Sequence, residues 1–420
     1  FCEELAKDFG PQSDTTKRTV SAFYDSLNLN NPRTVLFFET WMKTFSQIGY
    51  REKDLHGLEK HYRIGEDCTK LLFCIHTFYA LLVKLIAAEA VSMYTMNPSY
   101  TAELGKMDPQ KFKKSLEDLE EGIPFKTLIK ITNFIEGDCF SWYLDEFEKV
   151  MNVVREMAKT LSEYEFVTPV LNPEGTADVL KTIYQTLIPG PIRHNLGEYY
   201  TPEWLAQILL DRVGFTVNSF KRRAEEFQDA KNPLSLRLLD PACGSGTFLV
   251  EALKRLRRYA EDKCIESADY LLESIVGIDC NPLAVLTART NYLLHAGDLL
   301  DCTQERELPV YCADSVTLER ARYPFLCLPF DYVVGNPPWI VWDDLPQDYR
   351  TSTQPLWKMY GLFTLTPSQA RHGGGKKDIS MLFTYACADK YLKDTGTFGF
   401  LITQSVFKTK VQVRDSENSD

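Results

Sequence analysis

The stretch LLDPACGSGTFLVEAL, residues 238 to 253, joins a short apolar run, a turn with two glycines and an amphipathic segment. This pattern predicts a buried strand, a tight turn and a helix. Backbone amides at the start of a helix normally favour an anion, so the turn is a candidate ligand site.

The residues of this turn exclude two common phosphate ligands. No Gly-Lys-Ser/Thr is present, so the turn is not a P-loop, and Leu249 stands where a dinucleotide fingerprint requires glycine. Asp240, at the end of the predicted strand, would repel a pyrophosphate. A positively charged ligand without phosphate fits better, and S-adenosylmethionine, with a sulfonium, an ammonium and a ribose, is such a ligand.

Two more aspartates follow the next two predicted strands, at Asp279 and Asp314. A carboxylate after the second strand can accept both ribose hydroxyls, and Asp314 could accept a hydrogen bond from the adenine amino group. Each aspartate alone could instead be a turn former or a helix cap. The predicted cofactor residues are Asp240, Ala242, Gly244, Gly246, Asp279 and Asp314.

The stretch VVGNPPWI, residues 333 to 340, ends another apolar run and suits methyl transfer to an aromatic amine. The lone pair of such a nitrogen is delocalised into the ring, and two acceptors on its hydrogens would release it. Asn336 offers a side-chain oxygen and Pro337 a backbone carbonyl, stiffened by Pro338. Trp339 can stack on a planar base. An ordinary Asn-Pro turn after a strand is the alternative.

The order of the segments predicts the architecture. From about residue 175 short apolar runs alternate with helical patterns, which is the signature of a parallel α/β sheet. Residues 1 to about 165 show Lys- and Glu-rich helical patterns instead. We therefore expect a mainly helical domain over 1–165, a connecting helix over 166–195, an α/β catalytic domain over 196–408 and a polar tail over 409–420.

Three helices can be predicted in more detail. Asp108 is a candidate N-cap before Pro109, and Thr201 is a candidate N-cap before Pro202. The most apolar stretch, residues 71–91, contains His76, Lys84 and Glu89. These polar groups argue against a membrane span and favour a buried core helix.

Composition limits the remaining possibilities. The formal net charge is −11 and the pI about 5.2, so any grip on nucleic acid must be local. The eleven cysteines form no C-x-x-C pair and no metal-ligand spacing, so we expect no metal site. Their scatter indicates reduced thiols and a cytoplasmic location.

Together these residues resemble the N6-adenine DNA methyltransferases, in the block order of type I modification subunits and of fused restriction–methylation enzymes. The resemblance covers roughly the second half of the chain, and its NPPW and DPACGSG motifs are highly specific. The matching blocks are GEYYTP (197–202), LDPACGSGTFL (239–249), GIDCNP (277–282), ADS (313–315) and DYVVGNPPW (331–339).

The resemblance implies a Rossmann-like, mostly parallel seven-stranded sheet that binds S-adenosyl-L-methionine. It also implies that Thr201 and Asp240 hold the methionine end of the cofactor, that Asp279 takes the ribose and that Asp314 takes the adenine. Phe383 would line the same pocket. The family normally continues with a further aromatic block and a target-recognition domain, so the chain is expected to be a piece of a longer protein.

The predicted function is site-specific adenine-N6 methylation of DNA in a restriction–modification or phage-defence system. The implied partners are double-stranded DNA with a flipped adenine, and a nuclease or specificity region in the same or another chain; no membrane is expected. Lys376 and Lys377, in the Gly-rich loop 370–378, are predicted to touch phosphates, unless this loop is only a linker. Methylation of a protein glutamine, and a non-catalytic cofactor-binding subunit, remain alternatives.

Overall fold

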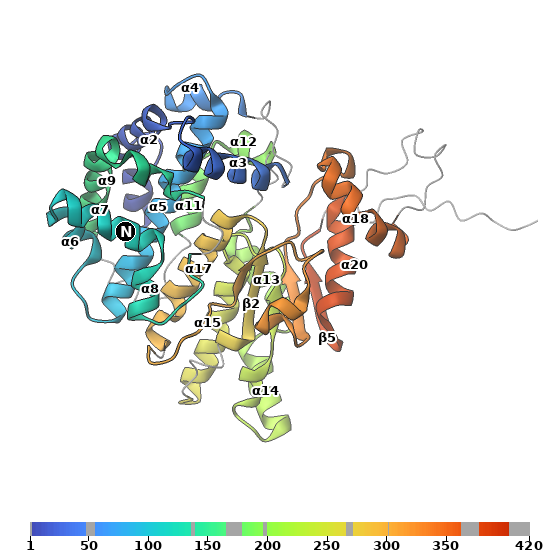
Figure 1. Ribbon diagram of the computed structural model, residues 1–420. Helices are drawn as coiled ribbons and strands as arrows, with labels where there is room; N and C mark the ends of the chain where they lie inside the picture. The colour runs from blue at the N-terminus through green and yellow to red at the C-terminus, as the bar shows by residue number, and fades with distance from the viewer. Residues whose placement is uncertain are drawn as a thin grey trace, which may run out of the picture.

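The computed structural model describes residues 2–47, 55–135, 139–164, 179–195, 200–265, 272–300, 302–362 and 378–402. In Figure 1 the helices of the first part of the chain, blue to green, lie beside a sheet and its helices, yellow to red. Lys376 and Lys377 lie outside the described residues.

The first part of the chain is helical, as predicted. Asp108 caps α7, because its carboxylate accepts a hydrogen bond from the Lys111 amide, and Pro109 is the first helical residue. The helices are α1 (Cys2–Asp8), α2 (Asp14–Ser26), α3 (Pro32–Gln47), α4 (Leu58–Tyr62), α5 (Cys68–Tyr94), α6 (Tyr100–Lys106), α7 (Pro109–Glu120), α8 (Ile123–Leu128), the 3-10 helix η2 (Ser141–Glu146) and α9 (Phe147–Ser162).

The second part begins with helices and continues as an α/β sheet. The helices are α11 (Val179–Leu187), α12 (Gly190–Asn195), α13 (Glu203–Arg212), α14 (Val217–Phe227), α15 (Thr247–Asp262), α17 (Pro282–Ala296), α18 (Gln347–Met359) and α20 (Ile379–Tyr391). The strands are β1 (Leu238–Asp240), β2 (Ile275–Asp279), β3 (Val310–Cys312), β4 (Phe330–Gly335) and β5 (Leu392–Phe400). Short 3-10 turns are η4 (Asn232–Ser235), η5 (Gly297–Leu299), η6 (Arg320–Arg322), η7 (Pro324–Leu326) and η8 (Trp342–Asp344).

All strand pairs in this sheet are parallel, in the order β3-β2-β1-β4-β5. Leu239 pairs with Val276 on one side and with Val333 on the other, so the strand order reverses between β1 and β4. A crevice forms at such a switch point, outside the carboxyl ends of the strands. The predicted α/β class is thus confirmed.

Two expectations need correction. The described residues contain a five-stranded sheet and not the seven strands expected, and the chain beyond residue 402 lies outside them. Helix α13 begins at Glu203 with Pro202 as its N-cap, so Thr201 is not the cap. The Thr201 hydroxyl instead accepts a hydrogen bond from the Asn336 amide, because tertiary packing brings the two segments together.

Side chains alternate between the two faces of the sheet, as the pleat requires. Leu238 and Ile275 join the core that continues into the helical part, while Leu239 and Val276 join a second core under α18 and α20. Helix α17 lies between the first face and α5, and all of its residues are buried. The sheet is therefore covered on both faces.

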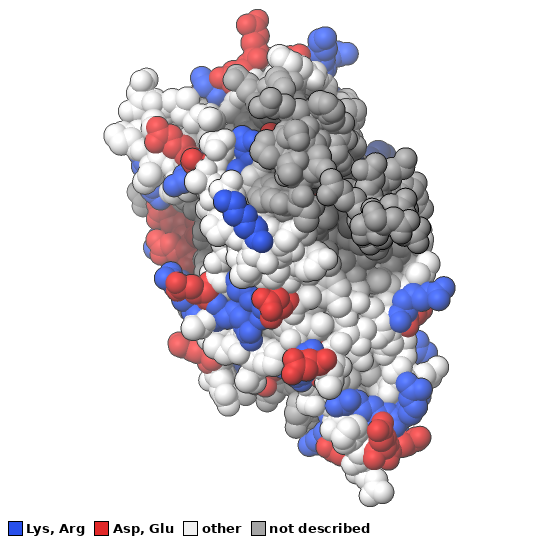
Figure 2. Space-filling model, turned by 90° about the vertical axis from the view of Figure 1, so that its right-hand side faces the viewer, with Lys and Arg blue, Asp and Glu red and all other residues white. Residues whose placement is uncertain are grey.

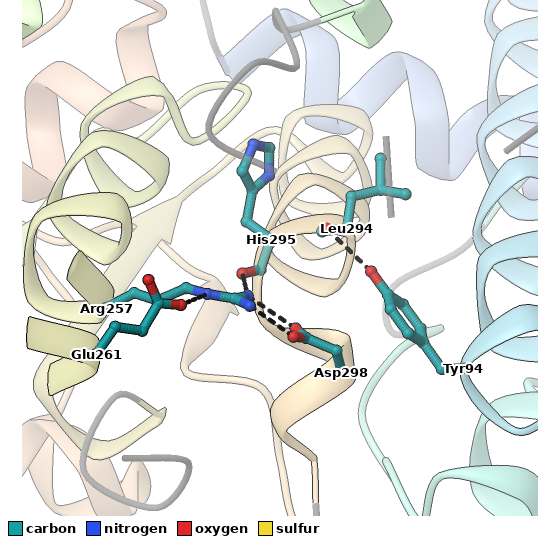
Figure 3. Close-up of polar contacts among 6 residues, drawn as sticks. All are labelled: Tyr94, Arg257, Glu261, Leu294, His295 and Asp298. Atoms are coloured by element: carbon teal, nitrogen blue, oxygen red, sulfur yellow. Dashed lines mark hydrogen bonds and ion pairs between the residues drawn. The ribbon is translucent and has the colours of Figure 1, made fainter. Parts of the chain in front are cut away.

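Figure 3 shows the polar contacts that hold the C-terminal end of α17 in place. The Tyr94 hydroxyl, from α5, donates to the Leu294 carbonyl at 2.9 Å. Arg257, from α15, donates to both carboxylate oxygens of Asp298 at 2.8 and 2.6 Å and to the His295 carbonyl at 3.2 Å. These contacts join α5, α15 and α17 by directional bonds as well as by packing.

Helix α5 is long and apolar enough to cross a membrane, and its most apolar 18-residue window is entirely buried inside the protein. Its polar groups have internal partners, as a core helix requires. Lys84 pairs with Glu120, and Glu89 accepts from the Thr101 amide and hydroxyl. The arrangement agrees with the predicted core helix.

We expect Lys84→Met to lower the free energy of unfolding by about 3–5 kcal/mol, because Glu120 would be left as a buried charge without its cation. Lys84→Met combined with Glu120→Gln should recover part of the loss, since glutamine can still accept the Tyr143 hydroxyl hydrogen. Urea unfolding measures both values. Lys114→Met, which breaks an exposed pair with Asp118, is the control and should have a much smaller effect, because solvent screens that pair. Equal losses for Lys84 and Lys114 would contradict the prediction.

Candidate active site

A cavity of about 580 Å³ lies at the carboxyl ends of the strands. Its size is within the range of small-molecule sites. The sheet contributes the turn after β1 and the residues that follow β2, β3 and β4. Further walls come from α3, α17, α18 and α20, and from Tyr200.

The turn after β1 is held by the acid that follows β2. Gly244 has a left-handed backbone, with φ of 54°, and a Cβ there would meet no atom within 4 Å, so the turn leaves open space at this point. Its amide donates to Asp279 Oδ2 at 2.9 Å, and the Asn281 amide donates to Asp279 Oδ1. Asp279 therefore fixes the turn and lines the cavity at the same time.

Gly246 has a different role from Gly244. It is the N-cap of α15 at φ of 88°, and a Cβ there would stand 3.3 Å from the Ala288 Cβ. It does not line the cavity, so its lack of a side chain serves the close approach of α15 to α17.

Asp240 is buried just behind the cavity wall. Its Oδ1 accepts from the Ala242 amide at 3.1 Å, whereas Oδ2 has no hydrogen-bond partner among the described residues. Burial, followed by the nearby charge of Asp279, raises the pKa of the Asp240 carboxyl to about 8. A Cβ on Gly335, at the end of β4, would come within 2.6 Å of Asp240 Oδ1, so this carboxyl requires glycine before Asn336.

Asp314 follows β3 and meets a residue that the sequence did not indicate. Its carboxylate accepts from the Val316 amide and the Thr317 hydroxyl, at 2.9 and 2.7 Å. Tyr349, from α18, lines the same cavity, and burial and then the charge of Asp314 raise the pKa of this phenol well above its ordinary value. Phe383, from α20, lines the same cavity.

Asn336 follows β4 and faces the cavity. Its Nδ2 donates to Thr201 Oγ1 at 3.3 Å, while Oδ1 is buried and has no hydrogen-bond partner in the described part of the chain. The Lys181 ammonium donates to the Thr201 carbonyl at 3.2 Å and so braces the segment before α13. The amide of Asn336 is thus oriented, with its acceptor still available.

The structure brings most of the predicted site residues to one cavity. Seven of them line it: Ala242, Gly244, Asp279, Asp314, Asn336, Pro338 and Phe383. Five others lie outside its lining: Thr201, Asp240, Gly246, Pro337 and Trp339. The roles assigned to these residues remain predictions.

Sequence reasoning missed the walls that come from other parts of the fold. Tyr349 and Asp348 belong to α18, whose polar sequence carries no ligand motif. Tyr200 precedes the Thr-Pro pair, and Lys43 and Thr44 come from α3 in the helical part. No signal in the sequence marks these contacts, because they depend on how distant elements pack.

A parallel α/β sheet with a cavity of this kind at its switch point, lined by acids and by Asn336 and Pro338, is typical of a methyltransferase. The chain belongs to the N-6 DNA methylase family, whose model matches residues 176–411. S-adenosyl-L-methionine is the cofactor that this fold and family imply. The residues present fit it, since Asp279 and Asp314 line the cavity, and carboxylates can partner positive groups and hydroxyls.

Individual methyltransferases are also similar in sequence to this chain. The methylase subunit of the type I restriction enzyme MjaVII from Methanocaldococcus jannaschii is 24% identical, over 51% of this chain and 30% of its own length. The type II methyltransferase M.VspI from a Vibrio species is 25% identical, over 56% of this chain and 43% of its own. The chain thus spans less than half the length of these relatives.

Among solved structures, the methyltransferase subunit of a type I restriction–modification system from Streptococcus thermophilus is similar. It is 17% identical, with a TM-score of 0.46, and the match covers 97% of this chain and 75% of that one.

We predict that the raised pKa of Asp240 makes cofactor binding dependent on pH. The pKa of this carboxyl is ordinarily 3.8, as in the unfolded chain, and about 8 in the folded protein, so the stability contributed by the protonated form is lost as pH rises from about 4 to 8. A positively charged ligand favours the carboxylate. We therefore expect S-adenosylmethionine binding at pH 7 to release up to about one proton. Calorimetry in buffers of different ionisation enthalpy measures the number of protons released on binding. The same release from Asp240→Asn would contradict the assignment.

Proposed function

We propose that the chain carries the catalytic site of a DNA adenine-N6 methyltransferase of a restriction–modification or phage-defence system. The observation that carries this proposal is the Asn336 side chain. It stands at the end of β4 on the cavity, oriented by Thr201, with a buried Oδ1 that lacks a partner among the described residues. A buried acceptor of this kind is costly unless a ligand N–H satisfies it.

An exocyclic amino group supplies that N–H. Asn336 Oδ1 accepts one hydrogen of the amine and the Pro337 carbonyl accepts the other, which draws the nitrogen lone pair out of the ring. The bound cofactor supplies the electrophilic methyl group. The acceptor oxygens of the chain therefore hold the amine in place and stabilise the positive charge that develops on its nitrogen.

The target base must leave its duplex to reach this position. Trp339, three residues after Asn336, is half-buried and supplies a flat surface for the extruded adenine. On the cofactor side, Asp279 serves the ribose and Asp314 the adenine. Both carboxylates also accept hydrogen bonds from backbone amides in their own turns, as expected if they were only turn formers. Each carboxylate can still accept further hydrogen bonds from a ligand.

The described surface suits local DNA contacts rather than a broad basic face. On the face shown in Figure 2, Lys and Arg side chains lie in small groups beside Asp and Glu, and part of the face carries neither. This agrees with the formal net charge of −11. Lys376 and Lys377, which lie outside the described residues, remain the proposed phosphate contacts.

The proposal is tested by methyl transfer from labelled S-adenosylmethionine to DNA, with this chain or with any longer protein that contains it. We expect Asn336→Ala to lower the rate by roughly 10²–10³, the scale of losing one positioned transition-state partner. Cofactor affinity should change little, because Asn336 serves the substrate. Thr201→Val should have a smaller effect, since it removes only the partner of Asn336 Nδ2, and Thr201→Ser is the matched control that keeps the hydroxyl.

The product distinguishes this proposal from its alternatives. Label on a protein glutamine, or on cytosine, would contradict the assigned substrate. Cofactor binding without transfer to any DNA, in a preparation of the longest natural protein, would indicate a non-catalytic subunit. Full activity of Asn336→Ala would contradict the proposed chemistry.

A second prediction concerns the base. Trp339→Ala should weaken the productive DNA complex by about 1–3 kcal/mol, the contribution of one base stack, and Trp339→Phe should restore most of it because any flat ring can stack. The ratio of kcat to KM on DNA measures both variants. Equal activity of Trp339→Ala and the unchanged protein would remove Trp339 from the site.

A further inference from the structure

We propose that Lys43, on helix α3 of the helical part, binds the carboxylate of the methionine moiety of S-adenosylmethionine. The helical part would then be a wall of the cofactor site and not only a support for the sheet. This inference rests on the proposed function for the identity of the cofactor and goes beyond it in naming the residue that recognises one of its groups.

The first observation is position. Lys43 and Thr44 line the same cavity as Gly244, Asp279 and Asn336, although α3 is far from them in sequence. Tyr200, which leads into the Thr-Pro pair, lines the cavity too. In Figure 1, α3 lies on the side of the helical part that faces the sheet and α18. The cavity is therefore built from both parts of the chain.

The second observation is charge. The acidic residues in the lining are Asp279, Asp314 and Asp348, and Lys43 is the one basic residue in it among those that the structure describes. S-adenosylmethionine carries two positive groups and one carboxylate. The acids suit the positive groups and the hydroxyls, but they repel the carboxylate, which needs a cation.

The third observation is that the glycine turn has little left to offer an anion. Amides at the start of a helix usually bind a carboxylate, yet several here are already committed. The Ala242 amide donates to Asp240 and the Gly244 amide to Asp279. The Cys243 amide donates to the Ile278 carbonyl, and the Gly246 amide to the Cys243 carbonyl. These four amides are not available to a carboxylate, which increases the need for a side-chain cation.

Buried side-chain contacts hold helix α3 in place beside the cavity. Trp41 Nε1 donates to His76 Nδ1 at 3.1 Å, and burial lowers the pKa of His76 to about 3, so the ring is neutral with its proton on Nε2. That nitrogen faces the Tyr184 hydroxyl at 3.3 Å. The Tyr184 ring contacts the ring of Tyr200, with centroids 5.8 Å apart. Buried contacts thus connect α3 to the cavity wall.

The test compares two ligands that differ only in the carboxylate: S-adenosylmethionine and decarboxylated S-adenosylmethionine. Calorimetry gives their affinities for the unchanged chain, for Lys43→Ala and for Lys43→Arg. Lys43→Ala should weaken S-adenosylmethionine roughly 10- to 100-fold, the scale of one lost charge-assisted hydrogen bond, and leave the decarboxylated ligand unchanged. Lys43→Arg should keep most of the affinity. Lys106→Ala, at an exposed lysine on α6 outside the cavity, is the matched control.

Each other outcome is decisive. Equal weakening of both ligands by Lys43→Ala would mean that Lys43 acts only through packing, and an unchanged affinity for S-adenosylmethionine would remove Lys43 from the site. Either result overturns the inference and leaves the proposed function standing. If the unchanged chain binds neither ligand while circular dichroism shows it folded, the cofactor assignment fails, and the inference fails with it.

Discussion

Helix α5 packs against α17, and this contact joins the helical part of the chain to the sheet. Both helices are buried almost completely, so each depends on its neighbours to keep its apolar side chains out of water. Helix α17 covers one face of the sheet and begins just after Asp279. Helix α5 packs on α17 and belongs to the same hydrophobic core as the rest of the helical part. The same contact therefore completes the core of the sheet and fixes where α3 stands relative to the strand ends.

The position of the site follows from the strand order. Since β1 pairs with β2 on one side and with β4 on the other, Asp240 and Asn336 stand at neighbouring strand ends. Gly335 allows the Asp240 carboxyl to lie against β4. The result is a buried acid next to the cavity wall and an amide oxygen in that wall, each with a buried acceptor that has no partner among the described residues. Such groups cost stability in the free protein and are relieved by a ligand, which is typical of binding sites.

The acidic side chains that hold two of the turns also line the cavity. Asp279 holds the glycine turn, and Asp314 holds the turn after β3, while both line the cavity. A carboxylate that is held by backbone amides has a fixed direction, so its remaining acceptor sites are already oriented for a ligand. The turn-forming role of these acids and their proposed binding role are therefore compatible.

The parallel α/β class, the helical first part, the core helix 71–91 and the motifs that contribute most of the cavity could be predicted from the amino-acid sequence alone. These features depend on local periodicity, on glycine and proline geometry, and on the rule that parallel strands end at one edge. The sequence did not determine that Thr201 orients Asn336 instead of capping α13, or that Gly246 serves packing. Nor did it reveal Lys43 and Tyr349 in the cavity. Contacts between elements distant in sequence leave no periodic signal, so only the tertiary structure, with α5 packed on α17 and α18 beside the strand ends, decided which side chains enclose the site.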